Sequence, residues 1–124
     1  MINAVIIDDE PINISNLEQL LKVHCQDINV LKTASNALEG EKIILKNKPD
    51  LVVLDIQMPG LDGFGTLSEL RKRGFDAPII ALTAHAMKED RDRAFAAGFT
   101  DHLTKPINSK FLLESIQSHL KHSK

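Results

Sequence analysis

The chain has 124 residues, of which 43% are hydrophobic and 26% charged, and its formal net charge is -2. This length and composition are typical of one globular domain, which we expect to span residues 1–124. The slight negative charge gives nucleic acid and anionic membranes no electrostatic reason to bind, and the 4% of aromatic residues argues against a base-stacking surface. The single cysteine, Cys25, excludes a disulfide framework within the chain.

No apolar run approaches the roughly 20 residues that a membrane-spanning helix requires. The opening residues, MINAV, lack the basic segment that begins a secretory signal peptide. We therefore expect a cytoplasmic location, unless the chain is a piece cut from a larger protein.

Short β-rich runs alternate with helical stretches along the chain. Three of the runs, AVII, LVVL and IIAL, are continuously apolar, which is typical of parallel strands covered on both faces. Two further strands are weaker, because one is interrupted by Lys32 and the other contains His102. The predicted strands comprise residues 4–7, 30–33, 51–54, 79–82 and 101–103.

Apolar residues recur at helical spacing after each strand, at about residues 14–24, 38–45, 64–70, 87–97 and 113–120. The fourth helix differs from the others, because it carries KEDRDR and only a few small apolar residues. We expect it to bury little surface and to be loosely held. Five strands alternating with five helices predict a doubly wound, three-layer (βα)5 sandwich of the α/β class, with right-handed crossovers.

Polar side chains follow the strands at the point where each one ends. Asp8 and Asp9 follow the first strand, Asp55 the third, Thr83 the fourth and Lys105 the fifth. In open α/β sheets, ligands bind outside the carboxyl ends of the strands. We therefore expect these five side chains to converge at one edge of the sheet.

Carboxylates crowded together require a cation, since two like charges about 4 Å apart repel by roughly 4 kcal/mol at an effective dielectric constant near 20. Mg²⁺ is bound by carboxylates, waters and phosphate oxygens, and Mn²⁺ is the alternative ion. The metal, Lys105 and Thr83 would neutralise a phosphoryl group in transfer, with Asp55 as the nucleophile that forms an acyl phosphate. Each residue alone has an ordinary structural interpretation, as a helix cap or a surface side chain, so the prediction depends on their combination.

The motifs IDDE, LDIQMPGLDG, ALTAH and LTKP resemble those of response-regulator receiver domains of the chemotaxis-regulator-like kind, and the resemblance covers nearly the whole chain. It implies a flavodoxin-like parallel sheet with strand order 2-1-3-4-5. It also implies a signalling phosphoacceptor, which is not an enzyme but assists its own phosphorylation and dephosphorylation.

By this resemblance, Asp55 accepts a phosphoryl group from a sensor histidine kinase or a histidine phosphotransfer domain. Asp8, Asp9 and Asp55 match the acidic ligands of the family's Mg²⁺, and the backbone carbonyl of Gln57 matches a further ligand. Gln57 and His85 also occupy positions at which the family tunes its own hydrolysis rate.

The resemblance assigns the switch to residues near the last two strands. Thr83 matches the family's switch hydroxyl, Lys105 its lysine, and the bond from Lys105 to Pro106 its cis peptide, while the small Ala84 leaves the phosphoryl group accessible. The family often has Tyr or Phe where this chain has His102. Two interpretations stay open for His102: a modified switch residue that titrates near neutral pH, and a half-exposed strand residue without a switching role.

The resemblance further implies that phosphorylation shifts the face formed by the fourth helix, fifth strand and fifth helix, and so controls an output partner outside this chain. We expect a monomer or a phosphorylation-dependent dimer that binds neither nucleic acid nor membrane directly. A pseudo-receiver or an engineered scaffold that binds proteins without phosphorylation is the alternative. An aspartyl phosphatase is disfavoured, because that class typically has a second Asp at the position of Gln57, and a flavin-binding domain is disfavoured because DDEP would repel a phosphate.

Overall fold

The computed structural model describes residues 2–24, 27–56, 63–83, 88–104, 107 and 109–120. Five strands alternate with five helices along this part of the chain. In chain order they are β1 (Ile2–Ile7), α1 (Pro11–His24), β2 (Ile28–Ala34), α2 (Ala37–Asn47), β3 (Leu51–Asp55), α3 (Gly63–Lys72), β4 (Ile79–Thr83), α4 (Lys88–Ala97), β5 (Asp101–Thr104) and α5 (Ser109–Leu120).

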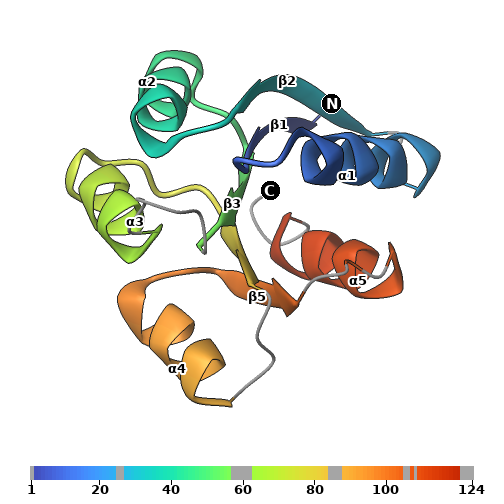
Figure 1. Cartoon of the computed structure of the whole chain (residues 1–124). Coiled ribbons are helices and arrows are strands. Elements are labelled where there is room, and N and C mark those ends of the chain that lie inside the picture. Colours follow the sequence, from blue (N-terminus) through green and yellow to red (C-terminus); the bar gives the residue numbers. More distant parts are fainter. Residues whose placement is uncertain are drawn as a thin grey trace.

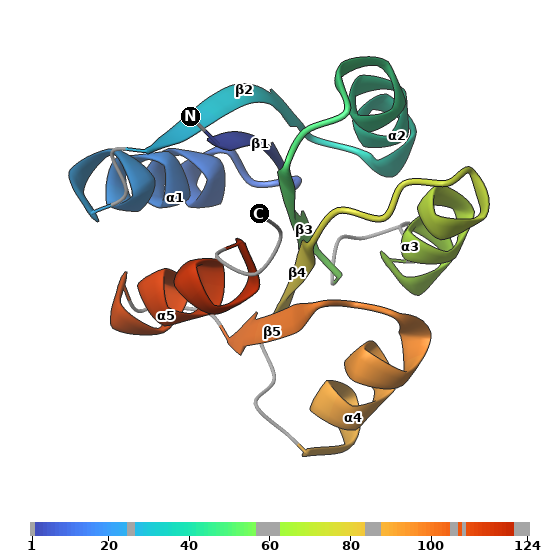
Figure 2. The same ribbon diagram turned by 180° about the vertical axis from the view of Figure 1, so that it is seen from behind.

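The strands form one parallel sheet in the order β2-β1-β3-β4-β5. Helices α1 and α5 cover one face, and α2, α3 and α4 cover the other (Figures 1 and 2). The predicted doubly wound α/β fold and its strand order are therefore confirmed. No helix in the described ranges is long and apolar enough to cross a bilayer.

The core has two halves, one on each face of the sheet. Successive residues of a strand point to opposite faces, so Val5 and Ile7 pack under α2 and α3 while Ala4 and Ile6 pack under α1 and α5. Every residue of β3 and β4 is buried. The continuous apolar runs of the sequence thus mark the strands that are covered on both faces.

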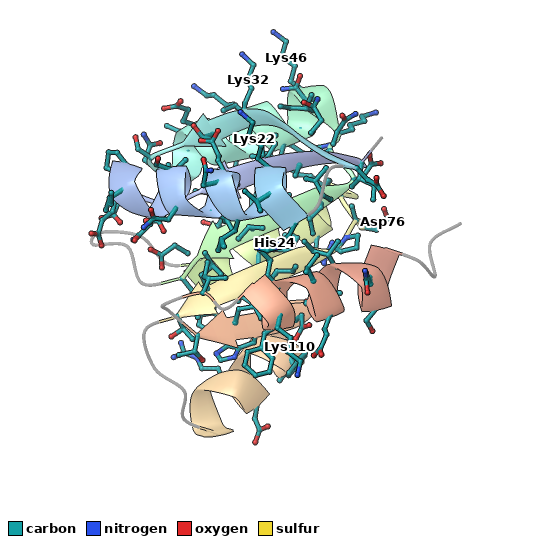
Figure 3. The ribbon with its side chains drawn as sticks, turned by 90° about the vertical axis from the view of Figure 1, so that its right-hand side faces the viewer. Lys22, His24, Lys32, Lys46, Asp76 and Lys110 are labelled. Atoms are coloured by element: carbon teal, nitrogen blue, oxygen red, sulfur yellow. The ribbon has the colours of Figure 1, made fainter. Side chains whose placement is uncertain are left out.

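Strands β1 and β2 both extend beyond the ranges predicted from the sequence, which were 4–7 and 30–33, because Ile2 pairs with Ile28 and Asn3 with Asn29 before the apolar runs begin. Strand β2 lies at an edge of the sheet. Its partner register shifts between Ala4, which pairs with Val30, and Val5, which pairs with Lys32. Lys32 is exposed and points outward at this edge (Figure 3). A bulge and a charged side chain both discourage an edge strand from pairing with another chain.

The end of β1 is fixed by the close approach of α2. Gly40 of α2 lies against Ile7, and a Cβ atom added to this glycine would lie 2.4 Å from the Cδ1 atom of Ile7. Asn36 caps the helix, since its side chain accepts a hydrogen bond of 2.8 Å from the backbone N–H of Glu39. Ile7 immediately precedes Asp8, so this packing helps to fix where the first acidic side chain lies.

Candidate functional site

Three acidic side chains meet at the carboxyl edge of the sheet. One carboxylate oxygen from each of Asp8, Asp9 and Asp55 lies within 4.8 Å of the others. Asp8 and Asp55 are 1% and 2% exposed, and Asp9 is half-buried. The adjacent strands β1 and β3 bring them together, because Ile7 pairs with Leu54 and the acids come next in each strand (Figure 1).

The turn between β1 and α1 orients the first acid. The backbone N–H of Asp8 donates to the carbonyl of Ala34 at 3.0 Å, which extends the strand ladder by one residue. Its side-chain Oδ1 accepts a hydrogen bond of 3.0 Å from the backbone N–H of Glu10. Pro11 then begins α1 at a position where its missing N–H costs nothing. Asp8 is therefore held through both its backbone N–H and its carboxylate.

The composition of this cluster fits a hard divalent cation. All three donors are carboxylate oxygens, and two of the acids are nearly excluded from water, so their negative charges are weakly screened. Mg²⁺ prefers such oxygen donors and is commonly held by a few carboxylates together with waters. Asp8, Asp9 and Asp55 are the residues that would hold it, as the sequence predicted from the strand ends.

Thr83 ends the next strand of the sheet and is 1% exposed. Strand β4 pairs with β3 through Leu82 and Asp55, and the backbone N–H of Ile56 donates to the carbonyl of Leu82 at 3.0 Å. The hydrogen-bonded pairing of β3 with β4 thus continues up to the site, and it brings Thr83 to the same edge of the sheet as the acidic cluster.

His102 lies in β5 beside Ala81 and is half-buried. Leu103 packs on the face of α1 and α5, so the alternation of the strand directs His102 and Thr104 to the face of α4. Thr104 pairs with Thr83, so His102 lies two residues before the partner of Thr83 and on the same face of the sheet. Both interpretations of His102 remain open.

Five predicted site residues lie outside the described part of the chain: Gln57, Ala84, His85, Lys105 and Pro106. Their roles stay predictions from the family resemblance.

One contact between α5 and the start of β5, away from the acidic cluster, has no signal in the sequence. Ser115 of α5, which is 5% exposed, donates a short hydrogen bond to Oδ2 of Asp101 at the start of β5. Oδ1 of the same carboxylate accepts the backbone N–H of His102 at 2.8 Å. Because 14 residues separate the partners, no local pattern identifies this link between α5 and β5.

A groove of about 380 Å³ opens beside the acidic cluster, between α1 and the sheet. Its lining includes Asn13, Asn16 and Leu20 on the side of α1, and Asp8, Leu82 and Ile107 on the other side. The groove offers an approach to Asp8 from the face covered by α1 and α5.

The chain belongs to the response regulator receiver domain family, whose model matches residues 4–117. Receiver domains are signalling domains of two-component systems, and they generally bind Mg²⁺ at an acidic pocket. The class predicted from the four motifs is therefore confirmed.

Relatives and solved structures agree with this assignment. The chain is 35% identical over 120 residues to an uncharacterized 14.6 kDa protein of Leptolyngbya boryana, with 94% of this chain and 88% of the relative covered. It is 37% identical over 119 residues to the transcriptional regulatory protein YvrH of Bacillus subtilis, covering 96% of this chain but 49% of that protein. A response regulator receiver domain protein of Clostridium thermocellum has a similar structure, with a TM-score of 0.87, 30% identity, and 99% and 97% of the two chains covered. The chain thus spans about half the length of some curated relatives.

Proposed function

We propose that this chain is the phosphoacceptor receiver domain of a two-component phosphorelay, that the domain spans residues 1–124, and that Asp55 takes the phosphoryl group. The observation that carries the proposal is the cluster of Asp8, Asp9 and Asp55, whose carboxylate oxygens lie within 4.8 Å of one another. A divalent cation held by these carboxylates would offset their mutual repulsion and the negative charge of an incoming phosphoryl group.

The transfer is an in-line displacement. A carboxylate oxygen of Asp55 attacks the phosphorus, the bond from phosphorus to the donor's imidazole nitrogen breaks, and that nitrogen keeps the electron pair. Bound Mg²⁺ supplies positive charge that offsets the negative charge of the phosphoryl oxygens. Asp8, Asp9 and Asp55 would hold the ion, together with the backbone carbonyl of Gln57. Water later hydrolyses the acyl phosphate and restores the carboxylate.

Thr83 and Lys105 respond to the loaded state. Thr83 donates a hydrogen bond to a phosphoryl oxygen and Lys105 places its ammonium group on another, while Pro106 holds the lysine through a cis peptide bond. Ala84 leaves access to the group, and Gln57 and His85 set the hydrolysis rate. The resulting shift of α4, β5 and α5 is a change of populations, since couplings of this kind are typically about 1–3 kcal/mol.

The partners follow from the same chemistry. A histidine kinase or phosphotransfer domain donates the phosphoryl group, and the groove of Asn13, Asn16 and Leu20 supports an approach along α1. The output is a domain or protein outside residues 1–124, in keeping with a relative that is named a transcriptional regulatory protein and is about twice as long. We propose a cytoplasmic domain that is monomeric or dimerises on phosphorylation.

Intact-mass spectrometry after incubation with acetyl phosphate tests the proposal. We expect a phosphoryl adduct that depends on Mg²⁺ and is absent from Asp55→Asn. An adduct that persists in Asp55→Asn would show that another residue is the acceptor. A folded protein that takes up no phosphoryl group under any condition would favour the pseudo-receiver or scaffold alternative.

His102→Phe separates the two interpretations of that residue. If His102 is a switch residue, the variant should change how strongly phosphorylation activates the domain. Activation of the variant should also no longer depend on pH between 5.5 and 8, since an unperturbed His titrates near pH 6.5. Unchanged activation would indicate that His102 is only a strand residue.

A further inference from the structure

Gly40 lies in the first turns of α2, where a glycine is unfavourable for helix stability. Its backbone N–H donates to the carbonyl of the capping residue Asn36 at 3.1 Å, so it is part of the hydrogen-bonded helix. Glycine is less favourable there than alanine, because it loses more conformational freedom on folding. The glycines with a positive φ are Gly74 and Gly98, so the backbone of Gly40 does not require a glycine. The explanation for Gly40 must therefore be the space around it.

The space beside Gly40 is filled by the side chain of Ile7, the last residue of β1. A Cβ atom at residue 40 would lie 2.9 Å from Cγ1 of Ile7 and closer still to its Cδ1, whereas ordinary contacts begin at 3.4 Å. Gly40 is buried, and Ile7 is 0% exposed. Helix α2, which lies beside β1 and β2 on this face of the sheet (Figure 1), is thus packed on Ile7 without room for a methyl group between them.

Neither the helix nor the strand is free to give way. Asn36 caps the first turn of α2, and Ile44, one turn after Gly40, is fully buried in the same core as Ile7. In the sheet, Ile7 pairs with Ala34 of β2 and with Leu54 of β3. Extra volume on this side of the helix would therefore press on the end of β1, because the side chain of Ile7 has no open space to enter.

Asp8 directly follows Ile7 and would share any displacement of the strand end. The carboxylate of Asp8 is 1% exposed, and its Oδ1 accepts the N–H of Glu10 at 3.0 Å. Groups that form a binding site must lie within about 0.5 Å of the geometry that binds the ligand. A Cβ atom at residue 40 would need a displacement of at least this size, since 2.9 Å must become 3.4 Å.

We propose that Gly40 is a positioning residue for the metal site. Its lack of a side chain lets α2 approach Ile7, and this contact sets the position of the Asp8 carboxylate and so the affinity for Mg²⁺. The inference deepens the proposed function and rests on it, because Asp8 is one of the three acids that would hold the ion. It gives a part in metal binding to a helix that supplies none of those three acids.

A purely structural contact predicts a different result. Gly40→Ala would then change the stability of the domain but not the Mg²⁺ affinity of the folded protein. Ile44→Val provides the comparison, because it removes one carbon atom from a fully buried side chain of the same helix. Stability alone cannot decide, since alanine favours the helix while the added volume opposes folding.

Isothermal titration calorimetry with MgCl₂ measures the affinity directly. Gly40→Ala should bind Mg²⁺ at least about ten-fold more weakly than the wild type, an effect typical of groups that orient metal ligands, whereas Ile44→Val should stay within about two-fold. Equal affinities for the wild type and Gly40→Ala would overturn the proposal. So would an equal loss in Gly40→Ala and Ile44→Val.

A compensating variant tests whether the contact itself is responsible. Ile7→Val/Gly40→Ala moves one carbon atom from residue 7 to residue 40, which conserves the total volume of the pair, and it removes Cδ1, the atom nearest to the added Cβ. The double variant should bind Mg²⁺ within about three-fold of the wild type. If Gly40→Ala does not fold, the double variant should fold and bind. A double variant that recovers neither folding nor binding would overturn the proposal.

The amide proton of Glu10 reports the position of Asp8 without any metal, because it donates to Oδ1 of Asp8. Its NMR resonance should shift in Gly40→Ala, return toward the wild-type position in the double variant and stay unchanged in Ile44→Val. An unchanged resonance in Gly40→Ala would show that residue 40 does not act through Asp8.

This metal-free measurement separates a failure of the inference from a failure of the proposed function. If the wild type binds no Mg²⁺ while the Glu10 resonance follows the expected pattern, the proposed metal site is wrong. Coupling of Gly40 to Asp8 is then supported, and its role in metal binding is overturned. If the wild type binds Mg²⁺ and Gly40→Ala binds it equally well, only the positioning role is wrong.

Discussion

Helices α2 and α4 pack on the same face of the sheet and have 11 and 10 residues, but they are held in different ways. Helix α2 has a side-chain cap at Asn36, a left-handed residue after its end at Lys48, a fully buried Ile44 and a glycine in close contact with Ile7. Among the described side chains of α4, at residues 92, 93 and 95–97, none is buried. Arg93 lies on Phe64, and the carbonyl of Gly98, directly after the helix, accepts a hydrogen bond from Arg71.

This difference in packing between α2 and α4 agrees with the roles that we propose for Asp8 and Thr83, the site residues next to the two helices. Helix α2 packs on Ile7, directly before Asp8, where a metal cluster requires fixed carboxylates. Helix α4 follows Thr83 in the chain. In the proposed function, a signal that starts at Thr83 requires an element that changes its position at little cost in free energy. Elements that move are drawn from the least stable parts of a fold, and α4 has the features of such an element.

The largest expected difference is in core truncations. Ile44→Ala in α2 removes a fully buried side chain and should lower the free energy of unfolding by about 2–5 kcal/mol. Phe95→Ala in α4 removes a side chain that is 45% exposed and should change it by less than about 1 kcal/mol. Urea denaturation of the two variants measures both values. Equal losses would show that α4 is packed as firmly as α2.

The sequence predicted the buried strands and the acidic cluster because both depend on local pattern. Continuous apolar runs marked β1, β3 and β4, and an acid that directly follows such a run must lie at the carboxyl edge of the sheet. The extents of β1 and β2 were underestimated, because the pairs Ile2–Ile28 and Asn3–Asn29 continue the ladder beyond the apolar runs. The predicted weakness of α4 agrees with its described side chains.

The contacts around α4 and β5 could not be predicted in the same way. The acceptors of Arg71 are backbone carbonyls, which every residue has, and Gly98 is 27 residues away in sequence. The partners Ser115 and Asp101 are also brought together only by the packing of α5 on β5. Such links depend on three-dimensional packing, and a single sequence carries no periodic signal for them.

The two faces of β5 differ as well, and Ser115→Ala tests this. On one face Ser115 ties α5 to Asp101, whereas the other face is covered by the loosely held α4. Loss of a hydrogen bond to a charged, half-buried group should lower the free energy of unfolding by about 1–3 kcal/mol. Ser118→Ala on the exposed side of α5 is the control and should change it by less than about 0.5 kcal/mol. Urea denaturation that shows no difference between the two would mean that the Ser115 contact adds nothing to the attachment of β5.

The last expected change in stability is at the acidic cluster, and it should have the opposite sign. Asp9→Asn removes one of three crowded charges, so the metal-free protein should become more stable by at least about 1 kcal/mol, the repulsion of two charges about 4 Å apart in bulk water. The wild type should gain about 1.4 kcal/mol from Mg²⁺ at ten times its dissociation constant, and the variant should lose most of this gain. Thermal unfolding with and without Mg²⁺ measures both effects, with the exposed Asp27→Asn as the control. A variant that is less stable without metal would show that Asp9 makes favourable contacts of its own, and that repulsion in the cluster is already relieved without a cation.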